Sequence, residues 1–181
     1  MERWRGVAVP VRIEVLDRRH RSLLGDFRNQ HESPVDYLKR YALRHAEKDL
    51  LARTFLAIDR TGESQRLAGY FTLATASVER ASVSPISALD RLPRFPIPGV
   101  LLARLAVDER AQGQGLGQFL FEEALGLTIQ LARGGPVAFR LFVTDAIDET
   151  AARFYERFGL VRLGDEYPCR MVLDLKPLVG R

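Results

Sequence analysis

Three glycines within five positions, Gly113, Gly115 and Gly117, have a spacing that is typical of an anion-binding loop. Glycine reaches backbone angles that a Cβ forbids, and it lets an anion approach the main chain closely. A helix that starts at such a loop adds unpaired N–H groups and the positive end of its dipole. The loop is therefore predicted to bind phosphate groups. The alternative is a glycine-rich turn without a ligand.

The spacing of the glycines narrows the kind of phosphate ligand. The segment does not fit GxxxxGK[ST], the loop of ATP- and GTP-binding proteins, and it does not fit GxGxxG, the dinucleotide fingerprint. It reads Arg110-x-x-Gly113-x-Gly115 instead. Neither of those two nucleotide sites is therefore expected here.

The segments on either side of the loop must position it. Val100–Val107 is apolar apart from Arg104, which is typical of a buried central strand. Gly115–Ala132 carries apolar residues at helical spacing and is expected to be a long helix. A strand, a glycine loop and a helix in this order place free N–H groups at the helix start.

The rest of the chain predicts an alternation of strands and helices. Ser33 and Pro34 fit the N-cap and first position of a helix, and Asp148 and Gly159 fit the two caps of another. Three prolines between Leu92 and Gly99 predict a stiff loop. Strands are expected at Val11–Val15, at the hairpin Arg53–Asp59 and Arg66–Ala76, and at Val137–Val143, Leu160–Leu163 and Arg170–Leu175.

Composition places the chain among ordinary globular proteins. Of its 181 residues 46% are hydrophobic and 28% charged, which fits a single domain over 1–181. No apolar run approaches the ~20 residues of a membrane span, and the N-terminus lacks a signal-peptide pattern, so a cytoplasmic protein without membrane contact is expected. One cysteine, Cys169, excludes an internal disulfide, makes a metal site unexpected and is predicted to be a buried thiol.

The basic charge is concentrated in the first third of the chain. Residues 1–60 hold thirteen Lys and Arg against nine Asp and Glu, a difference of +4 that equals the net charge of the whole chain. A localised basic surface attracts an anionic partner such as nucleic acid, and the alternative is a solvated surface with a small basic excess. Candidate contacts with such a substrate are Arg44, Lys48, Arg91, Arg94 and Arg104.

Two blocks of sequence together resemble the GNAT N-acetyltransferases. The Arg110-x-x-Gly113-x-Gly115 loop is similar to their pyrophosphate loop, (Q/R)xxGx(G/A), which follows a strand ending in hydrophobic-Ala-Val-Asp. The segment VTDAIDETAARFYERFGL is similar to their strand followed by (N/D)xxAxxFYxxxGF. The resemblance implies an α/β (α+β) GNAT fold, a mixed sheet of about six to seven strands with flanking helices. Its two central strands splay apart to admit acetyl-CoA.

The same resemblance implies roles for individual residues. Tyr155 would be the acid that protonates the departing thiolate, a role that lowers the barrier to its departure. The alternative is a core aromatic whose hydroxyl finds another partner. The backbone of Leu105, Ala106 and Val107 would pair with the pantetheine of acetyl-CoA. The other residues implied to bind the cofactor are Arg110, Gln112, Gly113, Gln114, Gly115, Leu116, Gly117, Asp148 and Phe154.

The lack of an evident general base indicates which kind of amine accepts the acetyl group. The three histidines, His20, His31 and His45, fall in the N-terminal third and share no spacing suggestive of a site. A lysine amine with a pKa of about 10.4 would need a base, whereas an α-amino group with a pKa of about 7.7–8.0 would need little help. An α-amine acceptor is therefore favoured.

The order of segments over about residues 33–175 narrows the resemblance to the GNAT toxins of toxin–antitoxin systems. It implies acetylation of the α-amino group of aminoacyl-tRNA, a block of translation, a ribbon-helix-helix antitoxin and a homodimer. Arg104 matches an arginine of that family's GRLAVD stretch and is expected to face the acceptor, or else to be paired within the core. Two alternatives stay open: a GNAT enzyme for a protein N-terminus, lysine or small amine, and a non-catalytic acyl-CoA-binding module.

Overall fold

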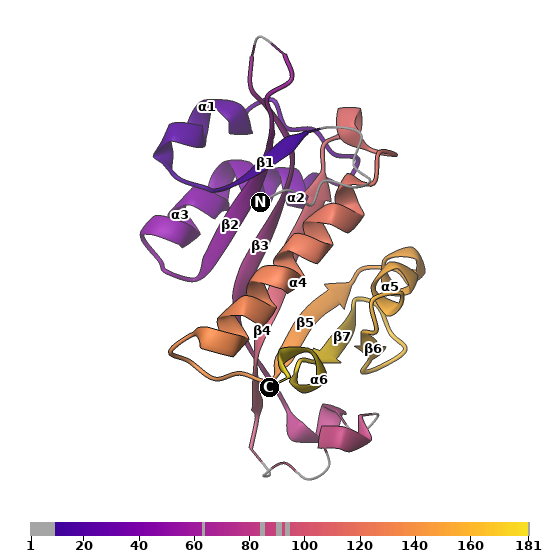
Figure 1. The fold of residues 1–181 in the computed structure, drawn as a ribbon. Helices are drawn as coiled ribbons and strands as arrows, with labels where there is room; N and C mark the ends of the chain where they lie inside the picture. The colour runs from indigo at the N-terminus through magenta and orange to yellow at the C-terminus, as the bar shows by residue number, and fades with distance from the viewer. Residues whose placement is uncertain (1–9, 63, 84–85, 90–91, 93–94, 181) are drawn as a thin grey trace. The chain divides into compact units, whose positions relative to one another are not determined.

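The computed structural model describes residues 10–62, 64–83, 86–89, 92 and 95–180. Its seven strands form one mixed sheet in the order β1-β2-β3-β4-β5-β7-β6 (Figure 1). The β4–β5 pair is parallel, whereas β1–β2, β2–β3, β5–β7 and β6–β7 are antiparallel. The strands are β1 (Val11–Val15), β2 (Ala52–Asp59), β3 (Arg66–Val78), β4 (Ile97–Val107), β5 (Leu141–Ala146), β6 (Val161–Arg162) and β7 (Cys169–Asp174).

Six α-helices accompany the sheet in the described part of the chain. The long one is α4 (Leu116–Gly134), and a π-helical turn (Tyr37–Tyr41) joins α2 to α3. The others are α1 (Arg21–Leu24), α2 (Glu32–Asp36), α3 (Ala42–Glu47), α5 (Glu149–Glu156) and α6 (Lys176–Val179). Among the described residues, no helix combines the length and the apolar character needed to cross a bilayer.

The chain divides into two compact units, each made of two separate stretches. Unit 1 takes the described residues within 1–74 and 104–124, and unit 2 takes those within 75–103 and 125–181. The elements β3, β4 and α4 each contribute residues to both units.

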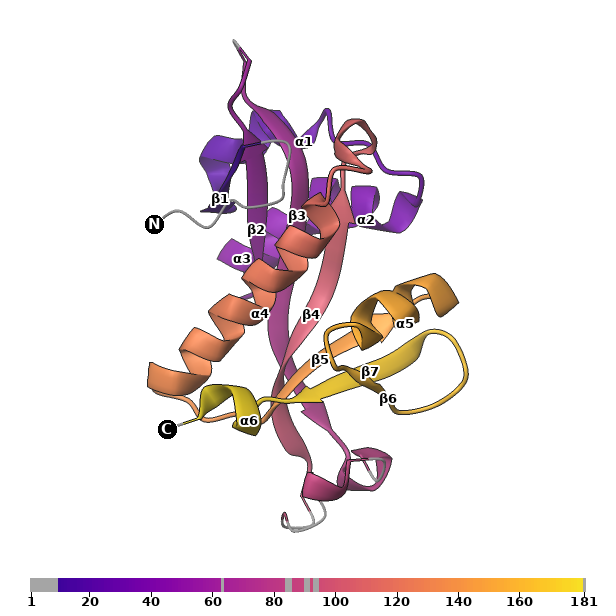
Figure 2. The same cartoon turned by 45° about the vertical axis from the view of Figure 1, so that its right-hand side comes forward.

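Unit 1 is a meander of antiparallel strands with helices on both faces. Tyr70 of β3 is fully buried in an apolar cluster with Leu38 of the π-helical turn and Leu56 of β2. A Cβ at the preceding residue, Gly69, would point to the opposite face of β3 and lie 2.8 Å from Leu120 Cδ1 of α4. Figure 2 shows the start of α4 in front of these strands and α2 and α3 behind them. Glycine at 69 therefore lets α4 pack closely against the sheet.

Unit 2 contains the first part of β4 with β5, β7 and β6. Four residue pairs, from Gly99↔Leu141 to Leu102↔Thr144, join β4 to β5. A Cβ at Gly99 would lie 2.8 Å from the Leu141 carbonyl oxygen, so only glycine allows this approach. The core of the unit consists of the buried side chains of Val78, Val83, Leu89, Ile97, Leu141, Val143 and Val172.

Most predicted elements are present, but one strand was placed wrongly. The prediction of β1, of the β2–β3 hairpin and of the long helix is confirmed. The strand predicted at Val137–Val143 starts instead at Leu141 and runs to Ala146. Val137 is 66% exposed, and the ladder that β5 forms with β7 starts at Leu141↔Asp174. The apolar residues before Arg140 therefore belong to a connection and not to the strand.

Two expectations that were based on prolines, a loop at Pro98 and a helix start at Ser33 and Pro34, are wrong in detail. Pro98 was expected in a loop but lies in β4. A proline is tolerated there because it is the second residue of the strand, where a missing N–H costs little. Its carbonyl accepts from Arg140 N–H at 2.9 Å. Ser33 is not an N-cap, since α2 starts at Glu32 after His31. Pro34 is tolerated inside the first turn, where N–H groups have no helical partner. The Asn29 side chain shapes the entry by accepting from His31 N–H at 2.9 Å.

Candidate functional site

The glycine loop in unit 1 has the backbone that the sequence predicts. Gly113 and Gly115 have φ angles of +75° and +77°, a left-handed conformation that side chains with a Cβ rarely adopt. Gly117 lies in the first turn of α4, where a Cβ would meet Val107 Cγ2 at an ordinary 3.8 Å. Two of the three glycines are therefore required by backbone conformation, and the third is not.

The loop leaves a run of main-chain donors unused. Within the described residues, the N–H groups from Gly113 to Gly117 donate to no other part of the chain, whereas Phe119 N–H donates to the Gly115 carbonyl at 3.1 Å. The start of α4 adds the positive end of a nineteen-residue helix. Such a group of donors fits an anion of the size of a phosphate.

A buried carboxylate fixes the start of this loop. Asp108 is 1% exposed and accepts from the backbone N–H of Arg28 at 2.9 Å and of Arg110 at 3.0 Å. The Arg110 guanidinium completes the pair with Nε–Oδ1 and Nη2–Oδ2 contacts of 2.7 and 2.9 Å. Burial alone would raise the pKa of Asp108, but these hydrogen bonds hold that pKa below its ordinary value. Asp108 therefore anchors the loop as an anion.

Arg110, predicted to bind the cofactor, has its side chain committed to the protein. Besides Asp108, its Nη2 donates to the Asp26 carbonyl at 2.9 Å. Gln112 donates through Nε2 to the Val107 carbonyl at 3.3 Å, and the Asn29 side chain donates to the same carbonyl at 2.9 Å. The Val107 carbonyl at the end of β4 is thus held by side chains from two other segments of unit 1.

Tyr155 lies on α5 of unit 2, in a cluster of aromatic rings. The predicted N-cap Asp148 is confirmed, because its Oδ1 accepts from Ala151 N–H at 2.8 Å. The Phe154 ring packs edge-on against those of Tyr155 and Phe158, at centroid distances of 5.2 and 5.3 Å. Burial raises the pKa of Tyr155 above its ordinary value. Tyr155 therefore keeps its proton at neutral pH, as an acid must.

The family model described as the acetyltransferase (GNAT) domain matches residues 53–161, which include both the glycine loop and Tyr155. The chain belongs to the GNAT acetyltransferase family. Over 149 residues this acetyltransferase is 32% identical to a tRNA-acetylating toxin of Mycobacterium tuberculosis, an alignment that covers 80% of this chain and 83% of the relative.

Solved structures of the toxin AtaT resemble this acetyltransferase along almost its whole length. AtaT complexed with acetyl-methionyl-tRNA is 25% identical with a TM-score of 0.81, covering 93% of this chain and 97% of AtaT. A tyrosine-to-phenylalanine variant of AtaT bound to the C-terminus of its antitoxin AtaR is 25% identical with a TM-score of 0.75, covering 93% and 95%. The mixed α/β GNAT fold with seven strands and flanking helices is thereby confirmed.

In this acetyltransferase a single arginine ties both ends of α5 to the sheet. Arg162 of β6 donates through Nε to Glu156 at 2.6 Å and through Nη1 to Glu149 at 2.7 Å. Tyr167 joins this network by donating to Glu149 at 2.5 Å, whereas Arg153 contacts Glu149 within the helix at 2.7 Å. Nothing in the spacing of these residues signals the network from sequence. It fixes the helix that carries Tyr155.

The structure describes three of the five residues predicted to contact the acceptor. Arg104 is exposed, with its guanidinium 5.2 Å from the centre of the Tyr37 ring, so the alternative of a charge within the core is wrong. Arg44 and Lys48 are also exposed, and Arg44 pairs with Asp49 at 2.9 Å. The other two candidates, Arg91 and Arg94, lie outside the described residues.

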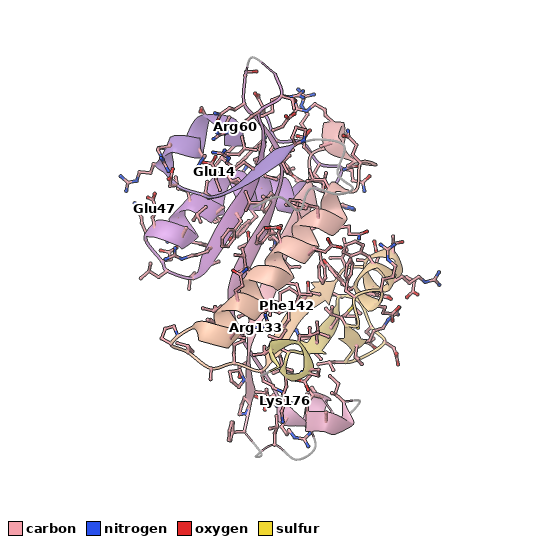
Figure 3. All side chains as sticks on the ribbon, in the orientation of Figure 1. Glu14, Glu47, Arg60, Arg133, Phe142 and Lys176 are labelled. Carbon is pink, nitrogen blue, oxygen red and sulfur yellow. The ribbon has the colours of Figure 1, made fainter. Side chains whose placement is uncertain are left out.

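The histidines of unit 1 have structural partners. His20 Nδ1 accepts from Asp17 N–H at 3.1 Å, which leaves its proton on Nε2, 3.3 Å from Glu14. Glu14 in turn accepts from Arg60, and Figure 3 shows the two side chains next to each other. His45 packs its ring against Tyr37. The described residues contain no group of three or more His, Cys, Asp or Glu that could hold a metal ion.

Cys169 is the chain's single cysteine and is buried, as predicted. Its Sγ donates to the Gly164 carbonyl at 2.9 Å. Thr144, which the sequence analysis did not select, is buried and donates from Oγ1 to the Leu102 carbonyl at 3.1 Å. A polar residue within the apolar run LFVTDA is the signal that could have identified it.

Proposed function

We propose that this acetyltransferase moves the acetyl group of acetyl-CoA to the α-amino group of aminoacyl-tRNA and thereby blocks translation as a toxin. The observation that carries the proposal is the identity with the tRNA-acetylating toxin over most of both chains. The AtaT complex, which holds an acetylated methionyl-tRNA, supports it from a second relative. An aminoacyl-tRNA is cytoplasmic, so the same location follows for the enzyme.

The donors of the glycine loop would hold the diphosphate of acetyl-CoA. We place the family pattern (Q/R)xxGx(G/A) on Gln112-x-x-Gly115-x-Gly117, because α4 starts between these glycines and the Arg110 guanidinium is engaged elsewhere. In this register the required left-handed glycine is Gly115. The backbone of Leu105, Ala106 and Val107 would pair with the pantetheine, and Phe154 would pack beside the coenzyme. Asp148 acts through its cap on α5.

Tyr155 would supply the proton that the reaction needs. The amine nitrogen forms a bond to the acetyl carbon, the carbon–sulfur bond breaks, and sulfur leaves as a thiolate with a pKa near ~8.5. Transfer of the Tyr155 proton to that sulfur makes its departure easier. An α-amine, with its low pKa, releases its own proton without a dedicated base. This fits the structural roles of His20 and His45 described above.

The basic first third of the chain would attract the tRNA. Arg44, Lys48 and Arg104 are exposed in unit 1 and can contact phosphates. A ribbon-helix-helix antitoxin and a homodimer are the protein partners we propose, the first because AtaT binds the antitoxin AtaR. We also propose that units 1 and 2 serve as one catalytic domain.

The experiment that tests the proposal offers several acceptors at once. The purified protein is incubated with labelled acetyl-CoA and a pool of aminoacyl-tRNAs, peptides and polyamines. We expect label on aminoacyl-tRNA, and growth arrest on expression that is lost in Tyr155→Phe. Label on peptides or polyamines with charged tRNA unmodified would establish the second reading, a GNAT enzyme for another amine. Binding of acetyl-CoA without any transfer would indicate a non-catalytic module.

A further inference from the structure

Three aromatic side chains of unit 1 form a row along the π-helical turn and α3. The centroid of the His45 ring lies 5.6 Å from that of Tyr37 and 5.9 Å from that of Tyr41. The Arg104 guanidinium of β4 extends the row, because it lies 5.2 Å from the centre of the Tyr37 ring. We call these four side chains the aromatic row. Since each contacts the next in the order Arg104, Tyr37, His45 and Tyr41, they form one continuous π surface.

The π-helical turn brings these rings into line. The Ala42 N–H donates to the Tyr37 carbonyl, five residues back along the chain. In an uninterrupted α-helix, positions eight apart are rotated by about 80° and separated by about 12 Å along the axis. A turn closed by an i→i+5 bond holds more residues, which removes part of this rotation and lets Tyr37 and His45 meet. π-helical turns are rare and are frequent at functional sites.

Tyr41 is the member of the row that the packing of unit 1 does not explain. Leu38 and Ala42, on either side of it in the chain, are fully buried, and Tyr37 packs against the same apolar cluster. Tyr41 is not a member of that cluster and is 42% exposed. Among the residues that the structure describes, nothing accepts a hydrogen bond from its hydroxyl. A large aromatic ring is therefore presented to solvent beside two others.

The charge around the aromatic row is positive. From Asp36 to Asp49 the chain carries three carboxylates, and each forms an ion pair with an arginine. The pairs are Arg40–Asp36 at 2.7 Å, Arg44–Asp49 at 2.9 Å and Arg18–Glu47 at 2.7 Å. Lys39 and Lys48 are exposed and, within the described residues, no carboxylate lies at ion-pair distance from either. Exposed rings with cations beside them suit an unpaired nucleobase and its phosphates, whereas an acidic peptide would use the cations alone.

We propose that the aromatic row is a stacking platform for an unpaired nucleobase at the 3′ end of aminoacyl-tRNA, with Tyr41 as the ring that the base covers. This inference rests on the proposed function, in which that 3′ end carries the amino acid to be acetylated. Lys39 and Lys48 contact the flanking phosphates. Stacking accepts any base, because every base has a π face, so the row holds the end of the tRNA without selecting a particular tRNA.

The test measures how the purified protein binds two RNA hairpins that share one acceptor stem. One hairpin ends in the unpaired 3′ nucleotides of a tRNA, and the other lacks them. The variants are Tyr41→Ala and Tyr41→Leu, which remove the ring, and Tyr41→Phe and Tyr41→Trp, which keep one. Leu51→Ala is the matched control, since Leu51 is an apolar side chain of unit 1 that is 59% exposed. The other readouts are the melting temperature and the KM values for aminoacyl-tRNA and acetyl-CoA.

For Tyr41→Ala and Tyr41→Leu we expect the hairpin with unpaired nucleotides to bind about 10-fold more weakly, the size of one base–aromatic stack. The hairpin without them keeps its affinity, because only phosphates are contacted. The KM for aminoacyl-tRNA rises in the same proportion, whereas the KM for acetyl-CoA does not. Tyr41→Phe, Tyr41→Trp and Leu51→Ala bind both hairpins like the wild type. The melting temperature changes little, since Tyr41 lies outside the apolar cluster.

The results that overturn this inference differ from those that overturn the proposed function. Wild-type affinity of Tyr41→Ala and Tyr41→Leu for the hairpin with unpaired nucleotides excludes stacking on Tyr41, and so does an equal loss for both hairpins. If Tyr41→Ala does not fold, equal affinities of Tyr41→Leu and Tyr41→Phe refute the inference. None of these results affects acetylation of aminoacyl-tRNA by the wild-type enzyme. Conversely, a wild-type enzyme that leaves charged tRNA unmodified overturns the proposed function, and with it the assignment of the row to that substrate.

Discussion

Replacing Gly115 by alanine should separate the ligand-binding role of the glycine loop from its contribution to stability. A Cβ in the left-handed region costs about 1–2 kcal/mol, and Gly115 has φ +77°. For a chain of this size that corresponds to a fall in melting temperature of about 2–8 °C, which leaves the protein folded. The alanine relieves its strain by rotating the peptide groups, so the N–H groups from Gly113 to Gly117 no longer converge.

The assay is calorimetric titration with acetyl-CoA, for which we expect at least a ~10-fold loss of affinity, or about 1.4 kcal/mol. The matched control is Gly117→Ala, whose Cβ meets Val107 Cγ2 at 3.8 Å and strains nothing. In the first turn of a helix alanine is at least as stable as glycine. We expect this variant to keep both its melting temperature and its affinity. Equal affinities for the Gly115 and Gly117 variants would refute a diphosphate bound by this backbone.

Three further changes test other parts of the structure. Asp108→Asn should lower the free energy of unfolding at neutral pH, and should flatten its loss in acid, in urea titrations at several pH values. The pKa of Asp108 is depressed in the folded state, so its stabilisation is present above the ordinary value of 3.8 and is lost as pH falls through the folded value. Arg162→Ala should reduce kcat more than Arg153→Ala does, because only Arg162 binds both ends of α5; equal losses would contradict this. Gly99→Ala should destabilise by about 1–3 kcal/mol in thermal denaturation, since its Cβ would lie 2.8 Å from the Leu141 oxygen; an unchanged melting temperature would show that β4 can shift.

The sequence predicts those elements whose signal is local. Alternating or continuous apolar residues are enough for β1, the β2–β3 hairpin and most of β4, and Asp148 identifies the start of α5. The start of β5 is different, because Val137 and Leu141 are both apolar and only the register with β7 separates the strand from its connection. Long-range pairing decides such boundaries, and a single sequence contains no direct record of it.

The same distinction applies to the candidate site. The left-handed backbone of the loop could be predicted from its glycines, because glycine adopts this conformation most easily, and Gly113 and Gly115 do have a positive φ. The contact of the Arg110 side chain with the Asp26 carbonyl could not be predicted, since the two residues are eighty-four positions apart in the sequence. Nor could the hydrogen bond from Thr144 to the Leu102 carbonyl, which requires β4 and β5 to be paired.

The interleaved make-up of the two units has a consequence for synthesis on the ribosome. Unit 1 needs 104–124 as well as the first 74 residues, and unit 2 needs 75–103 together with the stretch beyond 124. Neither can be finished while only the first half of the chain has emerged, and no single proteolytic cut releases one of them whole. An enzyme that blocks translation, as we propose for this one, would thus acquire activity late, after almost all of these 181 residues had been made.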